Sequence, residues 1–299
     1  MAITGTGTSE SPYIVSTWEE FLSVATSTSV YIKCADNCVW DFNRIAPEGI
    51  QNINISFADW DGNGVQLKNI SYINQTDGNA FGLKFILSTS APCNMKNVNI
   101  INCYVNSYYT SYSTAFLHIN GRLHATNCTI SAYVNSGVFL TDQFTGTSSS
   151  SNETMFNVCS FTVKLQNSSV FFSAANTNRK IQMMNCKIDF ECSDTANIGN
   201  YNYPLMFWTN CKITGKLPTS GSWNIQGSTL VVDAYSINSQ GASSLRIAAG
   251  SSATTVNVLF NSSKFPTNYS FPGSLKVAST AQMTDISYLQ SIGFPVVEV

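Results

Sequence analysis

Short runs in which apolar and polar residues alternate recur along most of the chain, for example at 53–57, 98–101, 161–165 and 181–184. Each run has the length of a strand, and Asn, Gly, Ser or Asp residues border it, which is typical of a β-strand with one buried face. Loops of uneven length separate the runs, notably at 142–152. The pattern predicts an all-β protein built from many short strands.

An Asn-Cys unit, with Ile or Val two residues after the cysteine, recurs along this pattern at Asn102-Cys103, Asn127-Cys128, Asn185-Cys186 and Asn210-Cys211. Cysteines 103 and 128 are 25 residues apart, as are 186 and 211, while 159 and 186 are 27 apart and a longer step of 31 separates 128 from 159. A period in this range indicates a repeat architecture. Asn tolerates the left-handed backbone of a corner, and its amide can bond to the equivalent Asn one coil above and below. We therefore expect an inward-facing asparagine ladder, with the Cys and Ile neighbours pointing into the same interior.

A recurring unit of this kind argues against a catalytic role for Asn185-Cys186-Lys187, because a catalytic thiol is needed once and a ladder is needed at every coil. Lys187 and Lys212 are expected to point outward while their cysteine neighbours point inward. Residues 41–270 are predicted to form about nine coils of a β-helix, at roughly 25 residues per coil.

Both ends of the chain break the β pattern. In residues 1–40, Thr17 and Glu20 have the spacing of a capping box, and Trp18, Phe21 and Leu22 share one helical face, which predicts a short N-terminal capping helix. Residues 271–299 are predicted to form a C-terminal cap or docking segment. Its short helix carries the apolar stripe Met283, Ile286 and Leu289.

The composition excludes several classes of protein. Charged residues are 11% of the chain, against about 25% in a typical soluble protein, and the net charge is −2 with no Lys- or Arg-rich run. We expect no binding to nucleic acid. No apolar stretch approaches the roughly 18 residues of a membrane helix, and the N-terminus lacks the pattern of a signal peptide, so no membrane association is expected.

Nine cysteines, most of them one per repeat, are expected to be free, buried thiols made in a reducing compartment. Cys34 and Cys38 could face a metal or each other, but no second pair or nearby His completes a zinc set. We predict no metal site and no cofactor.

The recurring Asn-Cys-x-Ile units of the coils at 45–265 resemble those of the pectin-lyase-like superfamily. This resemblance implies a single-stranded, right-handed parallel β-helix. More narrowly, the lead-in at 5–15 with its Thr17-Trp18 helix, and the ending at 282–295, resemble short β-helix proteins encoded in phages and prophages of gut Firmicutes. Those proteins are usually taken as virion surface or tail-associated components. The resemblance implies a place in the virion after synthesis in the cytoplasm of the bacterial host. It also implies other virion proteins as partners and a homo-oligomer such as a trimer.

Enzymes of that superfamily cleave acidic polysaccharides, and hydrolysis requires two carboxylates a few ångströms apart. Asp59 and Asp61, in an Asp-Trp-Asp-Gly-Asn-Gly stretch, alternate with Asn63 as calcium ligands do, but Ile70 stands where such a loop needs Glu. A turn is the favoured interpretation. Asp189 and Glu191 share the outward face of one strand and could meet a sugar, although the ordinary polar side of a strand is favoured.

The two histidines, His118 and His124, flank an expected tight turn that contains Arg122. A His-Arg pair on adjacent strands could bind an anion. Without a carboxylate nearby in sequence, a catalytic dyad is not favoured.

Tyrosines concentrate at expected strand edges and loops, where their rings can stack on sugars or fill a partner's pockets. Tyr104 and Tyr133 belong to this set. The residues that we select as glycan or partner contacts are Tyr108, Tyr109, Tyr112, Tyr201 and Tyr203.

The combined expectation is a non-enzymatic structural or surface protein of a phage virion. It would be a tail or baseplate appendage, or a capsid decoration, with contact to a host-surface polysaccharide. The main alternative is a polysaccharide depolymerase, either a lyase or a hydrolase, that acts on host surface glycan. A third reading is glycan adhesion without cleavage.

Overall fold

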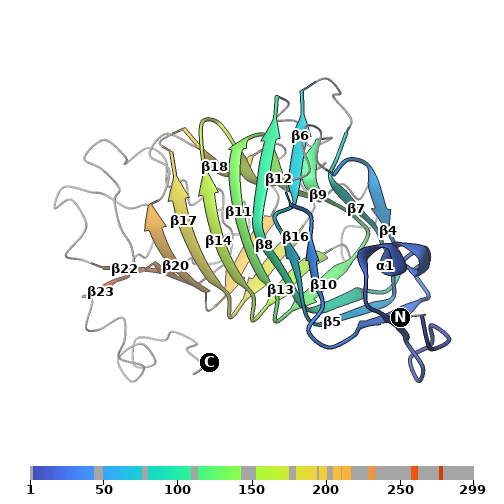
Figure 1. Cartoon of the computed structure of the whole chain (residues 1–299). Coiled ribbons are helices and arrows are strands. Elements are labelled where there is room, and N and C mark those ends of the chain that lie inside the picture. Colours follow the sequence, from blue (N-terminus) through green and yellow to red (C-terminus); the bar gives the residue numbers. More distant parts are fainter. Residues whose placement is uncertain are drawn as a thin grey trace.

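The computed structural model describes residues 3–43, 50–75, 80–108, 114–142, 153–174, 180–193 and 195–200, and shorter segments at 205–209, 211–216, 229–232, 257–261 and 276–278. In these residues successive turns of chain stack into a parallel β-solenoid (Figure 1). The predicted all-β β-helix is therefore confirmed. The total of about nine coils stays a prediction, as does the right-handed sense.

The larger sheet contains two ladders, and each ladder is a stack of parallel strands from successive turns. The long strands β5 and β8 belong to both ladders and join them. The first ladder consists of β1 (Tyr13–Val15), β2 (Tyr31–Cys34), the start of β5 (Asp59–Lys68), the start of β8 (Cys93–Ser107), β10 (Leu123–Thr126), β13 (Glu153–Asn157), β16 (Lys180–Met184) and β19 (Leu205–Thr209). The second ladder consists of β3 (Val39–Asp41), the later parts of β5 and β8, β11 (Thr129–Ser136), β14 (Ser160–Leu165), β17 (Lys187–Cys192), β20 (Cys211–Lys216), β21 (Thr229–Val232), β22 (Asn257–Asn261) and β23 (Lys276–Ala278).

A second, smaller sheet faces these ladders across the core. Its six strands also pair in parallel, and they are β4 (Ile53–Ile55), β7 (Leu83–Ile86), β9 (Ala115–Asn120), β12 (Val138–Asp142), β15 (Val170–Ala174) and β18 (Asn197–Asn200). One further strand, β6 (Ser71–Asn74), pairs with the end of β8.

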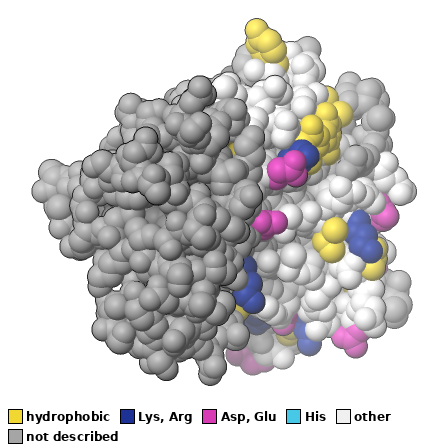
Figure 2. Space-filling view, turned by 90° about the vertical axis from the view of Figure 1, so that its left-hand side faces the viewer, with side chains coloured by type: hydrophobic (Ala, Val, Ile, Leu, Met, Phe, Trp, Pro, Cys, Tyr) yellow, Lys and Arg dark blue, Asp and Glu magenta, His cyan; other side chains and the backbone are white. Residues whose placement is uncertain are grey.

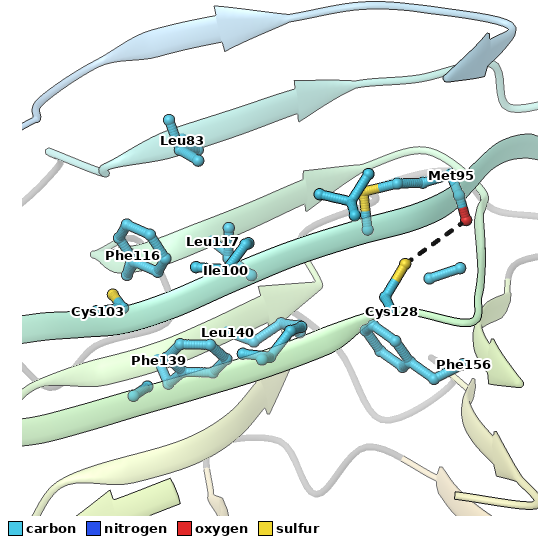
Figure 3. Close-up of a cluster of buried hydrophobic side chains, with 14 of the residues drawn as sticks. Leu83, Met95, Ile100, Cys103, Phe116, Leu117, Cys128, Phe139, Leu140 and Phe156 are labelled. Atoms are coloured by element: carbon cyan, nitrogen blue, oxygen red, sulfur yellow. Dashed lines mark hydrogen bonds between the residues drawn. The ribbon is translucent and has the colours of Figure 1, made fainter. Parts of the chain in front are cut away.

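The interior is filled by columns of like side chains, because parallel strands in register place equivalent residues directly above one another. Ile130, Phe161 and Ile188 form one such column from β11, β14 and β17, and all three are buried. Figure 3 shows the packing between the sheets, with Ile100 of β8 near Leu117 of β9. The core thus lies inside the coils.

The N-terminal end is covered by α1 (Trp18–Val24), which begins with the predicted capping box of Thr17 and Glu20. Phe21 of this helix is fully buried, and its ring lies 5.5 Å from Trp40 and 4.4 Å from Trp60, centroid to centroid. The predicted N-terminal cap helix is confirmed. The helix expected around Met283 lies outside the described residues.

An asparagine ladder runs along the corner between the two ladders of strands. Asn127 Nδ2 donates to Asn97 Oδ1 at 2.8 Å, Asn97 Nδ2 donates to Asp61 Oδ1 at 3.0 Å, and Asn185 Nδ2 donates to Asn157 Oδ1 at 3.2 Å. Asn97, Asn127 and Asn185 all have positive φ, as expected at a corner. The predicted bonds between asparagines of neighbouring coils are confirmed. The predicted inward direction of the ladder is wrong, because Asn127 is exposed and Asn97 and Asn185 are only half-buried, so the ladder lies at the surface of the corner. At the equivalent position one turn holds Val158, with φ 54°.

The cysteine spacing predicts the wrong coil register at one step, between Cys103 and Cys128. Strand pairing stacks Cys128, Cys159 and Cys186, but it places Cys103 beside Ala132. Asn102-Cys103 therefore marks a second corner of its coil, where Asn102 Nδ2 donates to Asn69 Oδ1 at 2.6 Å. The 25-residue step from Cys103 to Cys128 is not a coil period, because similar local backbone needs produce the same residue pair at two different corners.

Candidate functional site

Asp59 and Asp61 lie half-buried at the start of β5, beside Lys96 of β8. Lys96 Nζ lies 3.5 Å from Asp59 Oδ1 and 3.8 Å from Asp61 Oδ2. Asp61 Oδ1 also accepts hydrogen bonds from the Asn63 backbone N–H at 2.9 Å and from Asn97 at 3.0 Å. These contacts favour a structural role for Asp61, since it ends the asparagine ladder.

Asp189 and Glu191 alternate along β17 with the buried residues Ile188 and Phe190, so both point outward as expected. Glu191 Oε1 lies 2.6 Å from Lys164 Nζ of the neighbouring strand β14, and both side chains are partly exposed. The ion pair with Glu191 raises the pKa of Lys164. Glu191 is thus engaged in a surface ion pair.

Tyr108 directly follows β8, and 74% of its surface is exposed, as a contact residue requires. Its backbone N–H donates to the Asn74 carbonyl at 2.9 Å, which ties this edge to β6. The other selected tyrosines, namely Tyr109, Tyr112, Tyr201 and Tyr203, lie outside the described residues.

Four side chains form a column on the outward face of the larger sheet, and the sequence pattern did not predict this column. Tyr104 of β8, Tyr133 of β11, Lys164 of β14 and Glu191 of β17 are in register on four successive strands. The ring centroids of Tyr104 and Tyr133 are 5.7 Å apart, and Lys164 Nζ lies 5.9 Å from the Tyr133 centroid. We call these four residues the tyrosine strip. Its two rings stand among the tyrosines noted in the sequence, but only strand register shows that they stack.

Polar side chains continue beside the tyrosine strip. Tyr133 Oη donates to Asn135 Oδ1 at 3.4 Å, and Asn135 Nδ2 donates to Asn106 Oδ1 at 3.2 Å. In the view of Figure 2 the charged side chains of the described surface stand singly or in small groups among uncharged polar ones. The strip therefore offers ring faces, amides and hydroxyls with little net charge.

A cleft with a volume of about 570 Å³ opens at the N-terminal end, between the start of α1, β3 and the segment at 50–53. This volume lies in the range of small-molecule and peptide pockets, roughly 300–1,000 Å³. Its described lining residues are Ser16, Thr17, Trp18, Glu19, Val39, Trp40, Asp41, Phe42, Ile50, Gln51 and Ile53. The sequence assigned most of these residues to the cap and suggested no site there.

His118 and His124 lie on strands of different sheets, β9 and β10, so their proximity in sequence does not pair them in one ladder. His118 alternates with the core residues Leu117 and Ile119 and is itself buried. Burial lowers its pKa to about 4, with a smaller contribution from Lys84. A buried, neutral imidazole here gives no support to an anion site.

Strand register places His118, Thr141 and Ser173 directly above one another on β9, β12 and β15. We call these three residues the polar column. All three are buried, and among the described residues neither ring nitrogen of His118 nor either hydroxyl finds a hydrogen-bond partner.

Cys34 and Cys38 pack as buried, free thiols. Trp60 Nε1 donates to Cys34 Sγ at 3.5 Å, and Cys38 Sγ donates to the Val15 carbonyl at 3.9 Å. Burial raises the pKa of Cys34 to about 12, which disfavours the thiolate that a metal needs. Within the described residues no group of three or more His, Cys, Asp or Glu side chains could hold a metal ion, and no helix is long and apolar enough to cross a membrane.

Comparison with known proteins adds no family: no family model matches the chain, and neither a curated protein nor a solved structure matches it.

Proposed function

We propose that this protein is a non-enzymatic structural protein on the surface of a phage virion, as a tail or baseplate appendage or a capsid decoration. In this proposal it contacts host glycans through the tyrosine strip. The observation that carries the glycan contact is the in-register stack of Tyr104 and Tyr133 on the outward face of a rigid solenoid.

The strip suits a carbohydrate for physical reasons. Tyrosine rings offer an apolar face and a polar tip, so they can cover the apolar face of a sugar ring and still bond to its hydroxyls. Neighbouring strands lie about 4.8 Å apart, so the strip repeats its contacts along the solenoid axis. Asn106 and Asn135 supply amides beside the rings. An extended polysaccharide that runs along the axis would meet several equivalent contacts.

The virion location rests on the resemblance of the lead-in and the ending to phage β-helix proteins. The lead-in is well formed: the backbone N–H groups of Thr6 and Gly7 both donate to the Ser11 carbonyl at 2.9 Å. Other virion proteins as partners, and a homo-oligomer such as a trimer, are parts of the same proposal.

Two experiments test the two halves of the proposal separately. Immunogold labelling of purified particles should place the protein on virions, and its absence from them would remove the virion assignment. For the glycan contact, binding of host-surface polysaccharide should fall about tenfold or more in a Tyr104→Ala, Tyr133→Ala double variant, since each lost stacking contact is worth roughly 1 kcal/mol. A Thr129→Ala, Thr162→Ala variant changes two exposed side chains of β11 and β14 and should bind as the wild type does.

The depolymerase alternative has one supporting observation, since Lys96 holds Asp59 and Asp61 beside each other. An assay for reducing ends or for unsaturated products on host polysaccharide decides it. Product formation that is lost in Asp59→Asn, Asp61→Asn or Asp189→Asn variants would replace the non-enzymatic proposal.

A further inference from the structure

Strand β3 leaves one edge unpaired at the N-terminal end of the solenoid. It is the first strand of the second ladder, and among the described residues its only pairing is with β5. The neighbouring first ladder is different, because an antiparallel bridge between Thr4 and Ile14 covers its first strand, β1. An unpaired edge presents backbone donors and acceptors to any extended chain that reaches it.

The backbone bonds fix which groups of β3 face this open edge. The Gln66 N–H donates to the Cys38 carbonyl at 3.0 Å, and the Phe42 N–H donates to the Lys68 carbonyl at 2.9 Å. Cys38 and Phe42 therefore turn their backbone groups toward β5. Because a parallel strand directs alternate residues to opposite neighbours, Val39 and Asp41 turn theirs away from β5. No bond from these backbone groups is formed in the described part of the chain.

The open edge forms one wall of the N-terminal cleft, because Val39 and Asp41 both line it. Val39 is 50% exposed, which is unusual for a valine in a strand of this protein. Trp18, Phe42 and Ile53 supply further apolar surface around the edge. The cleft thus combines unpaired strand backbone with apolar side-chain pockets, the two parts of a site that binds peptides by strand addition.

The charge of the cleft selects among peptides. Its described lining contains the carboxylates of Glu19 and Asp41 and neither Lys nor Arg. Hydrogen bonds from Asn69 and from the Asn43 backbone lower the pKa of Asp41, and so does Lys68, which lies beside it on β5 but outside the cleft lining; this carboxylate is therefore ionised at neutral pH. A peptide with a Lys or Arg side chain complements this surface, whereas an acidic peptide is repelled.

We propose that the N-terminal cleft binds an extended segment of another polypeptide, which adds as a strand to the open edge of β3. The segment presents apolar side chains to Trp18, Phe42 and Ile53 and at least one Lys or Arg side chain to Asp41 and Glu19. Such a contact would attach the solenoid by the end that carries its cap, and it does not depend on the proposed glycan contact.

The test uses the full-length protein and an array of capped hexapeptides that alternate Val, Ile or Phe with Thr, each flanked either by Lys or by Glu. We expect the wild type to bind a subset of the Lys-flanked peptides, and the Glu-flanked versions of the same peptides to bind about tenfold weaker or less. N-methylation of the backbone of the best binders should weaken them about tenfold, because each methyl group removes a donor.

Two variants place the peptide on the β3 edge. Val39→Pro removes one outward N–H that makes no bond to β5, and proline is tolerated on edge strands, so the fold should persist while peptide affinity falls about tenfold. Val39→Thr retains the N–H but loses apolar surface, so a smaller loss of affinity in this variant than in Val39→Pro separates the backbone bond from the side-chain contact. Asp41→Lys leaves the backbone intact, and it should weaken the Lys-flanked peptides and strengthen the Glu-flanked ones. This variant decides the question even if Val39→Pro fails to fold.

The proposal is overturned if no Lys-flanked peptide binds with a Kd below about 1 mM, if N-methylated peptides bind equally well, or if Asp41→Lys leaves the charge preference unchanged. Sedimentation of the protein alone completes the test. Self-association that is lost in Val39→Pro would identify a second copy of this chain as the occupant, and it would overturn the assignment to a different polypeptide.

Discussion

Two stacks of polar side chains run along this solenoid, and only one of them satisfies its hydrogen-bonding groups. In the asparagine ladder, Asn127 donates to Asn97 and Asn97 donates to Asp61, at 2.8 and 3.0 Å. In the polar column, His118 and Thr141 are buried in register, yet their nitrogen and hydroxyl groups have no hydrogen-bond partner within the part of the chain that the structure describes.

The difference follows from the strand spacing. Neighbouring strands lie about 4.8 Å apart, whereas a hydrogen bond spans about 3 Å between heavy atoms. An amide has an acceptor and a donor on opposite sides of one group, so its own width fills the remaining distance and identical residues can bond repeatedly. A hydroxyl has a single oxygen and cannot span the gap to its counterpart. Stacked polar side chains therefore bond to one another along a solenoid only when the side chain matches the spacing between strands.

The largest expected effect is a loss of stability on acidification, through protonation of His118 in the polar column. The pKa of His118 is about 4 in the folded protein, because of burial and then Lys84, against about 6.5 in an unfolded chain. Neutral His118 is thus favoured on folding, and its contribution is fully present above pH 6.5 and lost as the pH falls toward 4. We expect about 3 kcal/mol of unfolding free energy to be lost over this window. Urea unfolding of wild type and His118→Phe at pH 7 and pH 4.5 measures it, and equal pH dependence in both proteins would contradict it.

Removal of a ladder amide should have the next largest effect. Asn127→Ala removes the side-chain hydrogen bond to Asn97. It also places alanine, which tolerates the left-handed region less well than asparagine, at φ 53°. We expect the two effects together to lower the unfolding free energy by about 2 kcal/mol. Asn127→Gly should recover the backbone part of this loss and separate it from the hydrogen bond. Thr129→Ala, at an exposed position two residues further along the chain, should stay within about 0.5 kcal/mol. A similar loss in all three variants would show that the ladder contributes nothing specific.

Deletion of an unsatisfied hydroxyl should stabilise the protein, because the column then contains one polar group fewer. Thr141→Val preserves the shape of a fully buried side chain whose Oγ1 has no hydrogen-bond partner among the described residues, and we expect a gain of about 1 kcal/mol in unfolding free energy. Thr162→Val makes the same change on the exposed face of β14 and should have little effect on the thermal midpoint. A lower midpoint for Thr141→Val would mean that the hydroxyl is satisfied.

A gain of similar size should come from repair of the corner at Val158. This residue has φ 54° and 39% exposure, and a β-branched side chain is strained in the left-handed region. Val158→Asn should gain about 1 kcal/mol by relief of that strain. Val158→Thr retains the β-branch and should gain nothing. Equal thermal midpoints for the Asn and Thr variants would show that the corner is not strained.

The local features of this protein could be predicted from its sequence because each depends on neighbouring residues. The capping box of Thr17 and Glu20, the alternation along β14 and β17, and the left-handed corners at Asn127 and Asn185 all require only the chemistry of a few consecutive positions. The outward direction of Asp189 and Glu191 follows from the same alternation.

The tertiary structure decided which residues lie above one another. Loops of different length set the register between coils, and this length cannot be inferred from a local motif, so Asn102-Cys103 and Asn127-Cys128 look alike but mark different corners. The stack of Tyr104 on Tyr133 depends on that register. The cleft beside Val39 depends on where the cap ends and which strand edge it leaves open. The sequence alone thus determined the coil and its corners, while the stacking of coils decided every surface on which a partner could bind.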